Sequence, residues 1–175
     1  MKKKLGLMFL LLLALVVASY AQTADNTSYT VSEIAASAFR KLVVNANVDV
    51  VLVQNDTLRK AYVEGDPNLV PGISITVADG TMIIASSKNI NYRGKVQVNI
   101  AVQELWKIEI NANAGIVSFD QLHSPKLYVS INGFCDLHLK SNGKIFLDAE
   151  DGYWIKYQNK SKKKSNVIIE GESEG

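Results

Sequence analysis

The chain has 175 residues, of which 47% are hydrophobic and 21% charged, and this length suits a single domain with a substantial core. Its net charge is +2, but the first 21 residues hold three lysines and no acid, so the remaining 154 residues carry 16 basic and 17 acidic side chains. That balance excludes the strongly basic surface typical of nucleic-acid-binding proteins, and the single cysteine, Cys135, excludes an intramolecular disulfide.

The N-terminus has the pattern of a secretory signal peptide. Three lysines at positions 2–4 precede an apolar run over residues 5–18, and Ser19-Tyr20-Ala21 places small residues where a signal peptidase reads them. The run of about 14 residues is shorter than the roughly 20 needed to span a bilayer. We therefore predict cleavage after Ala21, export, and no transmembrane segment in the processed chain.

The next segment, residues 22–34, is polar at its start and is expected to be a flexible leader. Residues 31–39 could begin a short helix or form an edge strand. From there the pattern predicts strands at 39–44, 48–53, 60–64 and 166–170, and a hairpin of 73–77 with 81–85 around Asp79-Gly80. Strict alternation over 95–102 places Val96, Val98, Ile100 and Val102 inward. No segment shows sustained helical periodicity, so the fold is expected to be all-β.

Residues 105–157 contain a repeat. Segments 105–116, 126–137 and 141–155 each have an alternating apolar run, a corner of Asn, Gly or Asp, and a second short run, so that Ile116, Leu137 and Ile155 align. Spacings of 21 and 18 residues are typical of a solenoid, in which each coil buries its apolar face against its neighbour. Residues 39–53 repeat the Asn-Ala-Asn corner and predict an earlier coil in a less regular N-terminal half.

These corners, together with Phe39-Arg-Lys-Leu-Val-Val44, resemble the family of putative auto-transporter adhesins with a head GIN domain. Its members are exported bacterial proteins, common in Bacteroidetes, that contain a domain of unknown function. The resemblance covers about residues 35–157. It implies a right-handed parallel β-helix-like solenoid in the periplasm or at the cell surface, and it implies no established activity. We accordingly expect one domain over residues 35–170, followed by an acidic tail at 171–175.

The family's corner, roughly Gly-Ser-Gly-Asp-Val, is kept only in part. The middle copy has both Gly133 and Asp136, and the bulky residues Phe134, Tyr153 and Trp154 suggest a shortened or capped stack. Three corner residues, Asn45, Asn111 and Asn132, should lie in register on successive coils. They could line a ligand groove, but stacked asparagines that hydrogen-bond one another are an ordinary structural device of such folds, so we interpret them, with Gly133 and Asp136, as structural corners.

An acidic group surrounds two neighbouring corners: Asp136, Asp148, Glu150 and Asp151. A carboxylate pair can hydrolyse a glycosidic bond, and β-helix enzymes that cleave acidic polysaccharides combine such groups with calcium and a basic residue. Here Arg40, Arg59 and Arg93 all lie outside the repeats, so a solvated turn is the better interpretation.

Metal and nucleophile sites are also poorly supported. The two histidines, His123 and His138, are 15 residues apart in different coils and lack cysteine support for zinc. Cys135 lies three residues from His138, and strand alternation would place them on opposite faces, so Cys135 is expected to be a buried corner residue. We predict no catalytic residue, no metal and no cofactor.

The best ligand-surface candidates are aromatic: Trp106, Tyr128, Tyr153 and Trp154. They could form a platform for sugar rings. The lysines at 156, 160 and 162–164 could bind an anionic surface but more readily block a terminal edge against strand addition. The leading hypothesis is a non-enzymatic binding or adhesion module for a glycan or an envelope protein, with a polysaccharide-active enzyme or a structural envelope protein as alternatives. An open coil end or an uncovered edge near Trp154 would favour a homo-oligomer.

Overall fold

The computed structural model describes residues 30–91, 93–149, 154–159 and 168–169, and this part of the chain is all-β, with one short 3-10 helix, η1 (Val70–Gly72). The strands form two seven-stranded sheets. Sheet A contains, in spatial order, β1 (Thr30–Ala35), β4 (Lys60–Gly65), β7 (Val96–Val102), β3 (Asp49–Gln54), β9 (Ala114–Ser118), β11 (Cys135–Ser141) and β13 (Trp154–Asn159). Sheet B contains β14 (Ile168–Ile169), β12 (Lys144–Ala149), β10 (Lys126–Ile131), β8 (Lys107–Ile110), β2 (Lys41–Val44), β6 (Thr81–Ser86) and β5 (Ile73–Ala78).

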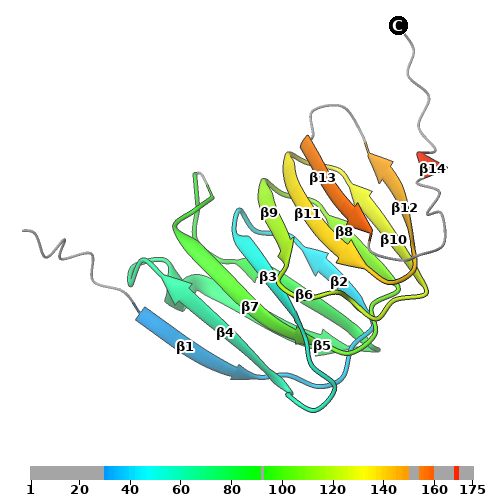
Figure 1. Ribbon diagram of the computed structural model, residues 1–175. Helices are drawn as coiled ribbons and strands as arrows, with labels where there is room; N and C mark the ends of the chain where they lie inside the picture. The colour runs from blue at the N-terminus through cyan, green and yellow to red at the C-terminus, as the bar shows by residue number, and fades with distance from the viewer. Residues whose placement is uncertain (1–29, 92, 150–153, 160–167, 170–175) are drawn as a thin grey trace, which may run out of the picture.

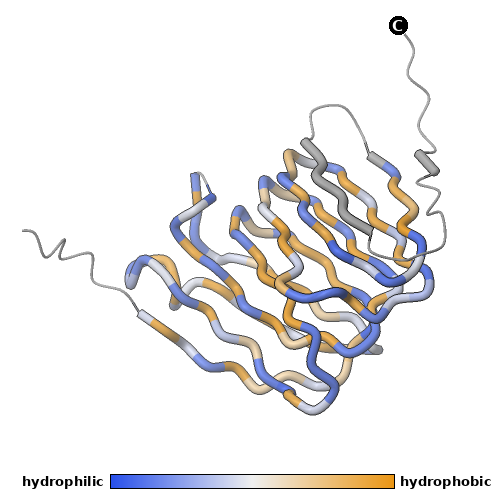
Figure 2. Tube along the Cα trace, viewed as in Figure 1, coloured by the Kyte–Doolittle hydropathy of each residue, from blue (hydrophilic) through white to orange (hydrophobic). Residues whose placement is uncertain are grey.

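The two sheets lie face to face, and the hydrophobic core fills the space between them (Figure 1). Each strand contributes alternate residues to this core because successive side chains of a strand point to opposite faces. Along β7, Val96, Val98, Ile100 and Val102 are at most 2% exposed, as their alternation predicted. The same alternation is visible along the strands in Figure 2. The prediction of an all-β fold is confirmed.

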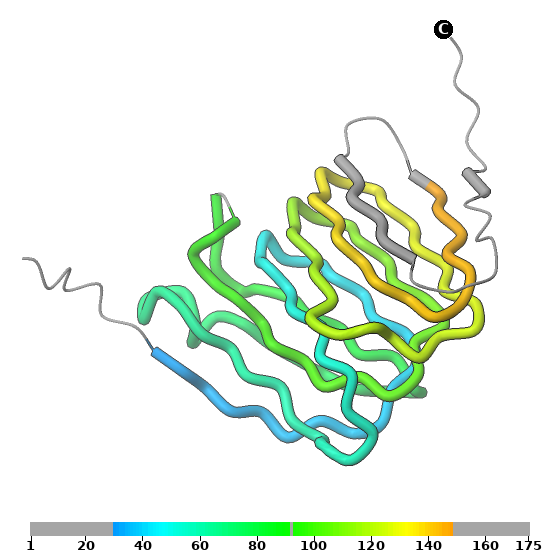
Figure 3. The backbone as a smooth tube through the Cα atoms, in the orientation of Figure 1, coloured from blue at the N-terminus to red at the C-terminus, as the bar shows by residue number. Residues whose placement is uncertain are grey.

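From β8 onward, each strand lies in the opposite sheet from the strand before it, so the chain passes back and forth between the layers (Figure 3). Neighbours within each sheet are then parallel and in register. In sheet A, Ile116 lies opposite Leu137 and Leu137 opposite Ile155, which confirms the predicted alignment of these three residues. In sheet B, Ile108, Val129 and Leu147 form the corresponding row.

The two strands predicted within residues 39–53 are also present. These strands, β2 and β3, lie beside β8 and β9, with Leu42 opposite Ile108 and Val50 opposite Ile116. The first half is less regular, as expected, because β1, β4 and β5 pair antiparallel while the remaining ladders are parallel. Both sheets are therefore mixed, and they are not closed: their outermost described strands are β1 and β5 at one end and β13 and β14 at the other.

The hairpin of β5 and β6 turns at the predicted dipeptide. Asp79 and Gly80 both have positive φ, 49° and 68°, which is the backbone of a two-residue type I′ turn. Ala78 pairs with Thr81 directly across it.

The last five residues of the segment expected as a leader, 30–34, lie in β1, and its residues 22–29 lie outside the described residues. This strand pairs antiparallel with β4, and the Nζ atom of Lys60 lies 2.6 Å from Oε1 of Glu33. Of the two alternatives for residues 31–39, the edge strand is the one observed. Ile34 is partly buried and its two neighbours are exposed, an alternation typical of a half-buried strand. The polar composition of the segment made this alternation hard to recognise in the sequence. The predicted signal peptide and the acidic tail lie outside the described residues.

Candidate binding surface on the outer face of sheet B

The outward positions of three parallel strands, β8, β10 and β12, form two rows on the outer face of sheet B. One row contains Lys107, Tyr128 and Phe146, and the other contains Glu109, Ser130 and Asp148. The residues between them, such as Ile108 and Val129, are buried in the core. Because parallel strands in register lie about 4.8 Å apart, side chains in one row contact each other directly.

Three aromatic side chains make a ladder on this face: Trp106, Tyr128 and Phe146. The rings of Tyr128 and Phe146 stack with centroids 4.8 Å apart and an interplanar angle of 14°. Trp106 meets Tyr128 at 6.5 Å and 71°, an edge arrangement. Tyr128 and Phe146 therefore use ring faces on each other, whereas Trp106, 47% exposed, does not stack a face on the ladder.

An open depression of about 530 Å³ lies beside the ladder. Its lining combines the two stacked rings with charged and hydroxyl groups: Lys107, Tyr128, Val129, Ser130, Phe146, Leu147 and Asp148. A lining that combines apolar rings with a few polar groups is common in small-ligand sites.

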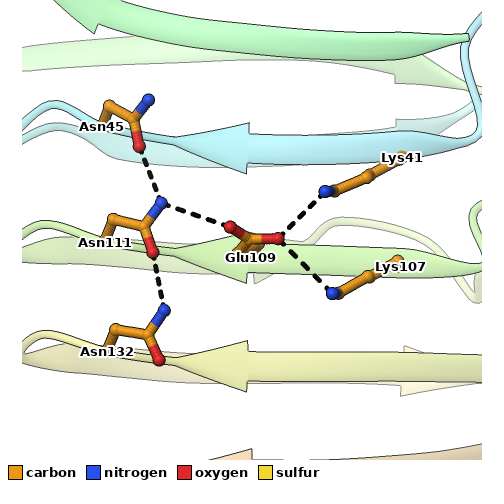
Figure 4. Close-up of polar contacts among 6 residues, drawn as sticks. All are labelled: Lys41, Asn45, Lys107, Glu109, Asn111 and Asn132. Atoms are coloured by element: carbon orange, nitrogen blue, oxygen red, sulfur yellow. Dashed lines mark hydrogen bonds and ion pairs between the residues drawn. The ribbon is translucent and has the colours of Figure 1, made fainter.

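A second ladder, of asparagines, runs along the same sheet at its corners (Figure 4). The Nδ2 of Asn111 donates to Oδ1 of Asn45 at 2.9 Å, and Nδ2 of Asn132 donates to Oδ1 of Asn111 at 2.7 Å. The structure thus places the three predicted corner asparagines in register and joins them by hydrogen bonds. Their amide groups bond one another instead of converging on a cavity.

Glu109 lies next to this ladder and binds two lysines. Its Oε2 is 3.0 Å from Nζ of Lys41 and 3.4 Å from Nζ of Lys107 (Figure 4). The hydrogen bond from Lys41 is the main cause that lowers the pKa of Glu109, with smaller contributions from Asn111 and Lys107, against partial burial. The carboxylate is therefore charged at neutral pH and fixes both lysines on the surface.

The absence of a side chain at the corner residue Gly133 allows its backbone to lie close to the backbone of Ala112. A Cβ atom on Gly133 would lie 2.6 Å from the carbonyl oxygen of Ala112 in the turn between β8 and β9. The structural role predicted for this residue rests on that approach of two backbones.

The other two predicted aromatic residues are Tyr153 and Trp154. Trp154 belongs to β13 in sheet A, and Tyr153 lies outside the described residues. The sequence analysis did not identify Phe146. Its position between the inward-facing residues Ile145 and Leu147 would have indicated that its side chain faces outward.

The two described members of the predicted acidic group are not brought together. Asp136 points outward from β11 in sheet A, and Asp148 lies on the outer side of β12 in sheet B, so the core separates them. A pair on opposite faces cannot flank one glycosidic bond. Glu150, Asp151 and the lysines at 160 and 162–164 lie outside the described residues.

Asp136 instead meets an arginine that the sequence placed far from the repeats. The Nη2 atom of Arg93 is 3.2 Å from Oδ2 of Asp136, across a depression of about 600 Å³ on the outer face of sheet A that Asp49 and His138 also line. Gly115 lies beneath them, and a Cβ there would be 2.4 Å from Oδ1 of Asp49 and 3.0 Å from Nη1 of Arg93. Arg93 lies outside the repeats in sequence, but its side chain reaches them from the loop before β7.

Cys135 is buried, and burial is the main cause that raises the pKa of its thiol to about 12. A thiol with this pKa is protonated at neutral pH and is a poor nucleophile. Among residues 30–91, 93–149, 154–159 and 168–169, no three His, Cys, Asp or Glu side chains are grouped as metal ligands would be. The same part of the chain contains no helix that is long and apolar enough to cross a membrane.

Comparison with solved structures supports the fold. The chain is similar to a putative adhesin from Bacteroides fragilis NCTC 9343, with a TM-score of 0.62 and 17% identity over 73% of this chain and 61% of that one. It is also similar to a putative adhesin from Parabacteroides merdae ATCC 43184, with a TM-score of 0.51 and 16% identity over 71% of this chain and 59% of that one. The chain spans about three fifths of the length of these proteins.

In sequence, residues 38–173 match the family described as "Putative auto-transporter adhesin, head GIN domain". No curated protein matches the chain.

Proposed function

The chain belongs to the head GIN domain family of putative auto-transporter adhesins, and from this membership we propose that it is an exported binding module of the bacterial cell envelope. Its ligand surface in this proposal is the outer face of sheet B. The observation that carries the proposal is the aromatic ladder of Trp106, Tyr128 and Phe146 beside an open depression with charged groups at its rim. Tryptophan and tyrosine that stay exposed on a rigid sheet are typical binding anchors.

The architecture in this proposal is a two-sheet β-solenoid whose C-terminal half is built from stacked coils. Alternation of consecutive strands between the sheets and in-register parallel pairing support it. A stack of this kind is stiff, and it holds side chains of successive coils in fixed rows. A ligand with a regular repeat, such as a polysaccharide, suits a surface made of such rows.

The cellular location in this proposal is the periplasm or the cell surface. Its support is the N-terminal pattern of lysines, an apolar run over residues 5–18, and small residues before the expected cut at Ala21. Mass spectrometry of the protein expressed from the full chain would detect the new N-terminus, Gln22.

The ligand class that we propose is a glycan, bound against Trp106. Aromatic faces bind the apolar faces of sugar rings, and Trp106 is the ladder residue whose faces are not taken up by stacking. Tyr128 and Phe146, stacked on each other, would contribute ring edges and the floor of the depression. We assign Trp154, on the other sheet, no part in this surface.

The module is non-enzymatic in this proposal. A polysaccharide-cleaving activity that paired Asp136 with Asp148 would need both on one face, and they lie on opposite ones. The remaining alternative, an envelope protein as partner, becomes the working hypothesis if no glycan binds.

The test is a glycan-array screen on the processed protein, followed by titration of any ligand found. We expect Trp106→Ala to weaken binding about tenfold or more, and Trp106→Phe to retain most of it. The matched control is Phe119→Ala, which removes a side chain that is 68% exposed at the end of β9 in sheet A. Equal loss in the control, or no binding by the unaltered protein, would refute a glycan site on sheet B.

A further inference from the structure

The edge strand β5 of sheet B lacks the features that usually protect a sheet edge. Within the described residues it pairs only with β6, and its six residues, Ile73–Ala78, include no charged residue and no proline. By contrast β1, the edge of sheet A at the same end, carries Glu33 in an ion pair with Lys60. Unprotected edges are templates for the addition of another strand, because their outward backbone groups have no partner in the sheet.

The hydrogen-bond pattern of the hairpin shows which backbone groups face outward. Ser87 donates to the carbonyl of Gly72, and the two-residue turn makes Ala78 and Thr81 a hydrogen-bonded pair. Residues 74, 76 and 78 therefore direct their backbone groups to β6, and residues 73, 75 and 77 direct theirs to the edge. The N–H of Ile73 is already bonded to the carbonyl of Val70, which leaves Ile75 and Val77 as the residues that present both groups.

The hydrophobic core is also incompletely covered at this edge. Ile75 and Val77 point toward the core but are only partly buried, whereas Met82 and Ile84 on the adjacent strand are 0% exposed. Ile34 and Leu69, which pack against the same core, are partly buried too. A further strand along β5 would cover apolar surface in addition to satisfying backbone groups.

We propose that β5 pairs antiparallel with β5 of a second copy of this chain, forming a two-fold dimer in which the two B sheets become one continuous sheet. Ile75 of each copy lies opposite Val77 of the other, and each such pair exchanges two backbone hydrogen bonds. Thr76 then faces Thr76 of the other copy across the two-fold axis. Threonine pairs across antiparallel strands are favourable.

A second copy fits this edge better than an unrelated strand because its charges are complementary. Asp79 directly follows the C-terminal end of β5, and Lys88 lies beside the N-terminal end, where a Cβ on Gly72 would be 2.7 Å from its Cγ atom. Antiparallel pairing in this register places Asp79 of one copy opposite Ile73 of the other, at the end of β5 where Lys88 carries the opposite charge on an ammonium that also donates to the carbonyl of Asn68. The two-fold axis creates this contact twice.

The first test is a disulfide trap. Thr76→Cys would bring two cysteines together at a non-hydrogen-bonded antiparallel position, where the Cα atoms lie about 4.5 Å apart and a disulfide can form. The matched control is Ser74→Cys on the same strand and face. In the dimer, position 74 of one copy would lie four residues along the strand from position 74 of the other. This separation of roughly 14 Å is beyond the reach of a disulfide. The native thiol of Cys135 is buried and does not interfere.

We expect a covalent dimer on non-reducing gels for Thr76→Cys and almost none for Ser74→Cys, with the protein produced from the full chain and used in its processed form. Sedimentation should show a dimer at tens of micromolar for the unaltered protein. Thr76→Lys, which keeps the fold because this side chain is exposed, should raise the dissociation constant about fivefold by placing like charges opposite each other.

A monomer at 100 µM, or equal cross-linking by both cysteine variants, would overturn the proposal. So would a dimer whose stability Thr76→Lys does not change. In that last case, the association would use a different surface or a different partner strand.

Discussion

The asparagine ladder allows a quantitative prediction because its three members differ in how many ladder bonds each makes. Asn111, in the middle, makes one ladder bond to Asn45 and one to Asn132, while each end residue makes one. All three are exposed, so water can replace a lost partner and no buried group is left unsatisfied. Each bond should then contribute about 0.5 kcal/mol, at the low end for hydrogen bonds. We expect Asn111→Ala to lower the free energy of unfolding by about 1 kcal/mol, and Asn45→Ala or Asn132→Ala by about half of that.

The assay is urea unfolding followed by circular dichroism, with the slope of the transition checked for constancy across variants. The contact between Asn111 and Glu109, 3.5 Å between Nδ2 and Oε1, is at the limit of a hydrogen bond and should contribute little. The double variant Asn45→Ala with Asn132→Ala removes both ladder bonds but keeps Asn111. It should therefore cost as much as Asn111→Ala alone.

Equal losses in all three single variants would refute the ladder as the source of the stabilisation. They would indicate that each asparagine acts through its own corner, by backbone preference instead of contact between coils. A double variant much less stable than Asn111→Ala would lead to the same conclusion.

Three further predictions concern the corners, the charged row and the thiol. Gly133→Ala should lower the free energy of unfolding by about 1–3 kcal/mol because the added Cβ meets a backbone carbonyl. Gly115→Ala should lower it less, because the closest contacts of the added Cβ are the mobile ends of two side chains. A larger loss of stability in urea unfolding for Gly115→Ala than for Gly133→Ala would contradict this. The lowered pKa of Glu109 means that its ion pairs stabilise the fold above the unfolded pKa of about 4.3, and that this stabilisation, about 1 kcal/mol, is lost as pH falls through the lower folded value. Glu109→Gln should therefore narrow the stability difference between pH 7 and pH 3, while Glu104→Gln, at an exposed pair with Arg40, serves as the control. Cys135, with a thiol pKa of about 12, should resist alkylation at pH 8 in the folded protein and react readily in urea, and rapid labelling of the native protein would contradict its burial.

Local patterns along the chain determined much of this fold. Alternation over 95–102 specified which side of β7 faces the core, and the repeat spacing aligned Ile116, Leu137 and Ile155. Both follow from the period of two in a strand, since a shift by one residue would expose every apolar side chain of that face. The turn at Asp79-Gly80 was equally readable because few other dipeptides accept two positive φ angles.

What the sequence could not show was which strands of different coils lie on the same face. Aromatic residues at 106, 128, 153 and 154 looked equivalent in the repeat. Tyr128 belongs to sheet B and Trp106 directly precedes β8 of that sheet, whereas Trp154 belongs to sheet A, and Phe146 completes the ladder. Asp136 and Asp148, close in sequence, lie on opposite faces for the same reason: the chain crosses from one sheet to the other at each corner.

Contacts between distant parts of the chain belong entirely to the tertiary structure. Arg93 reaches Asp136 from 43 residues away because the loop before β7 folds over the repeats, and the absence of a side chain at Gly115 leaves room for it. The position of β5 as the outermost described strand at one end of sheet B is likewise a property of strand order. Sequence periodicity determined which side chains of each strand face the core. Which strands lie next to each other was decided only by the packing of the sheets, because pairing partners depend on the whole chain and not on local alternation.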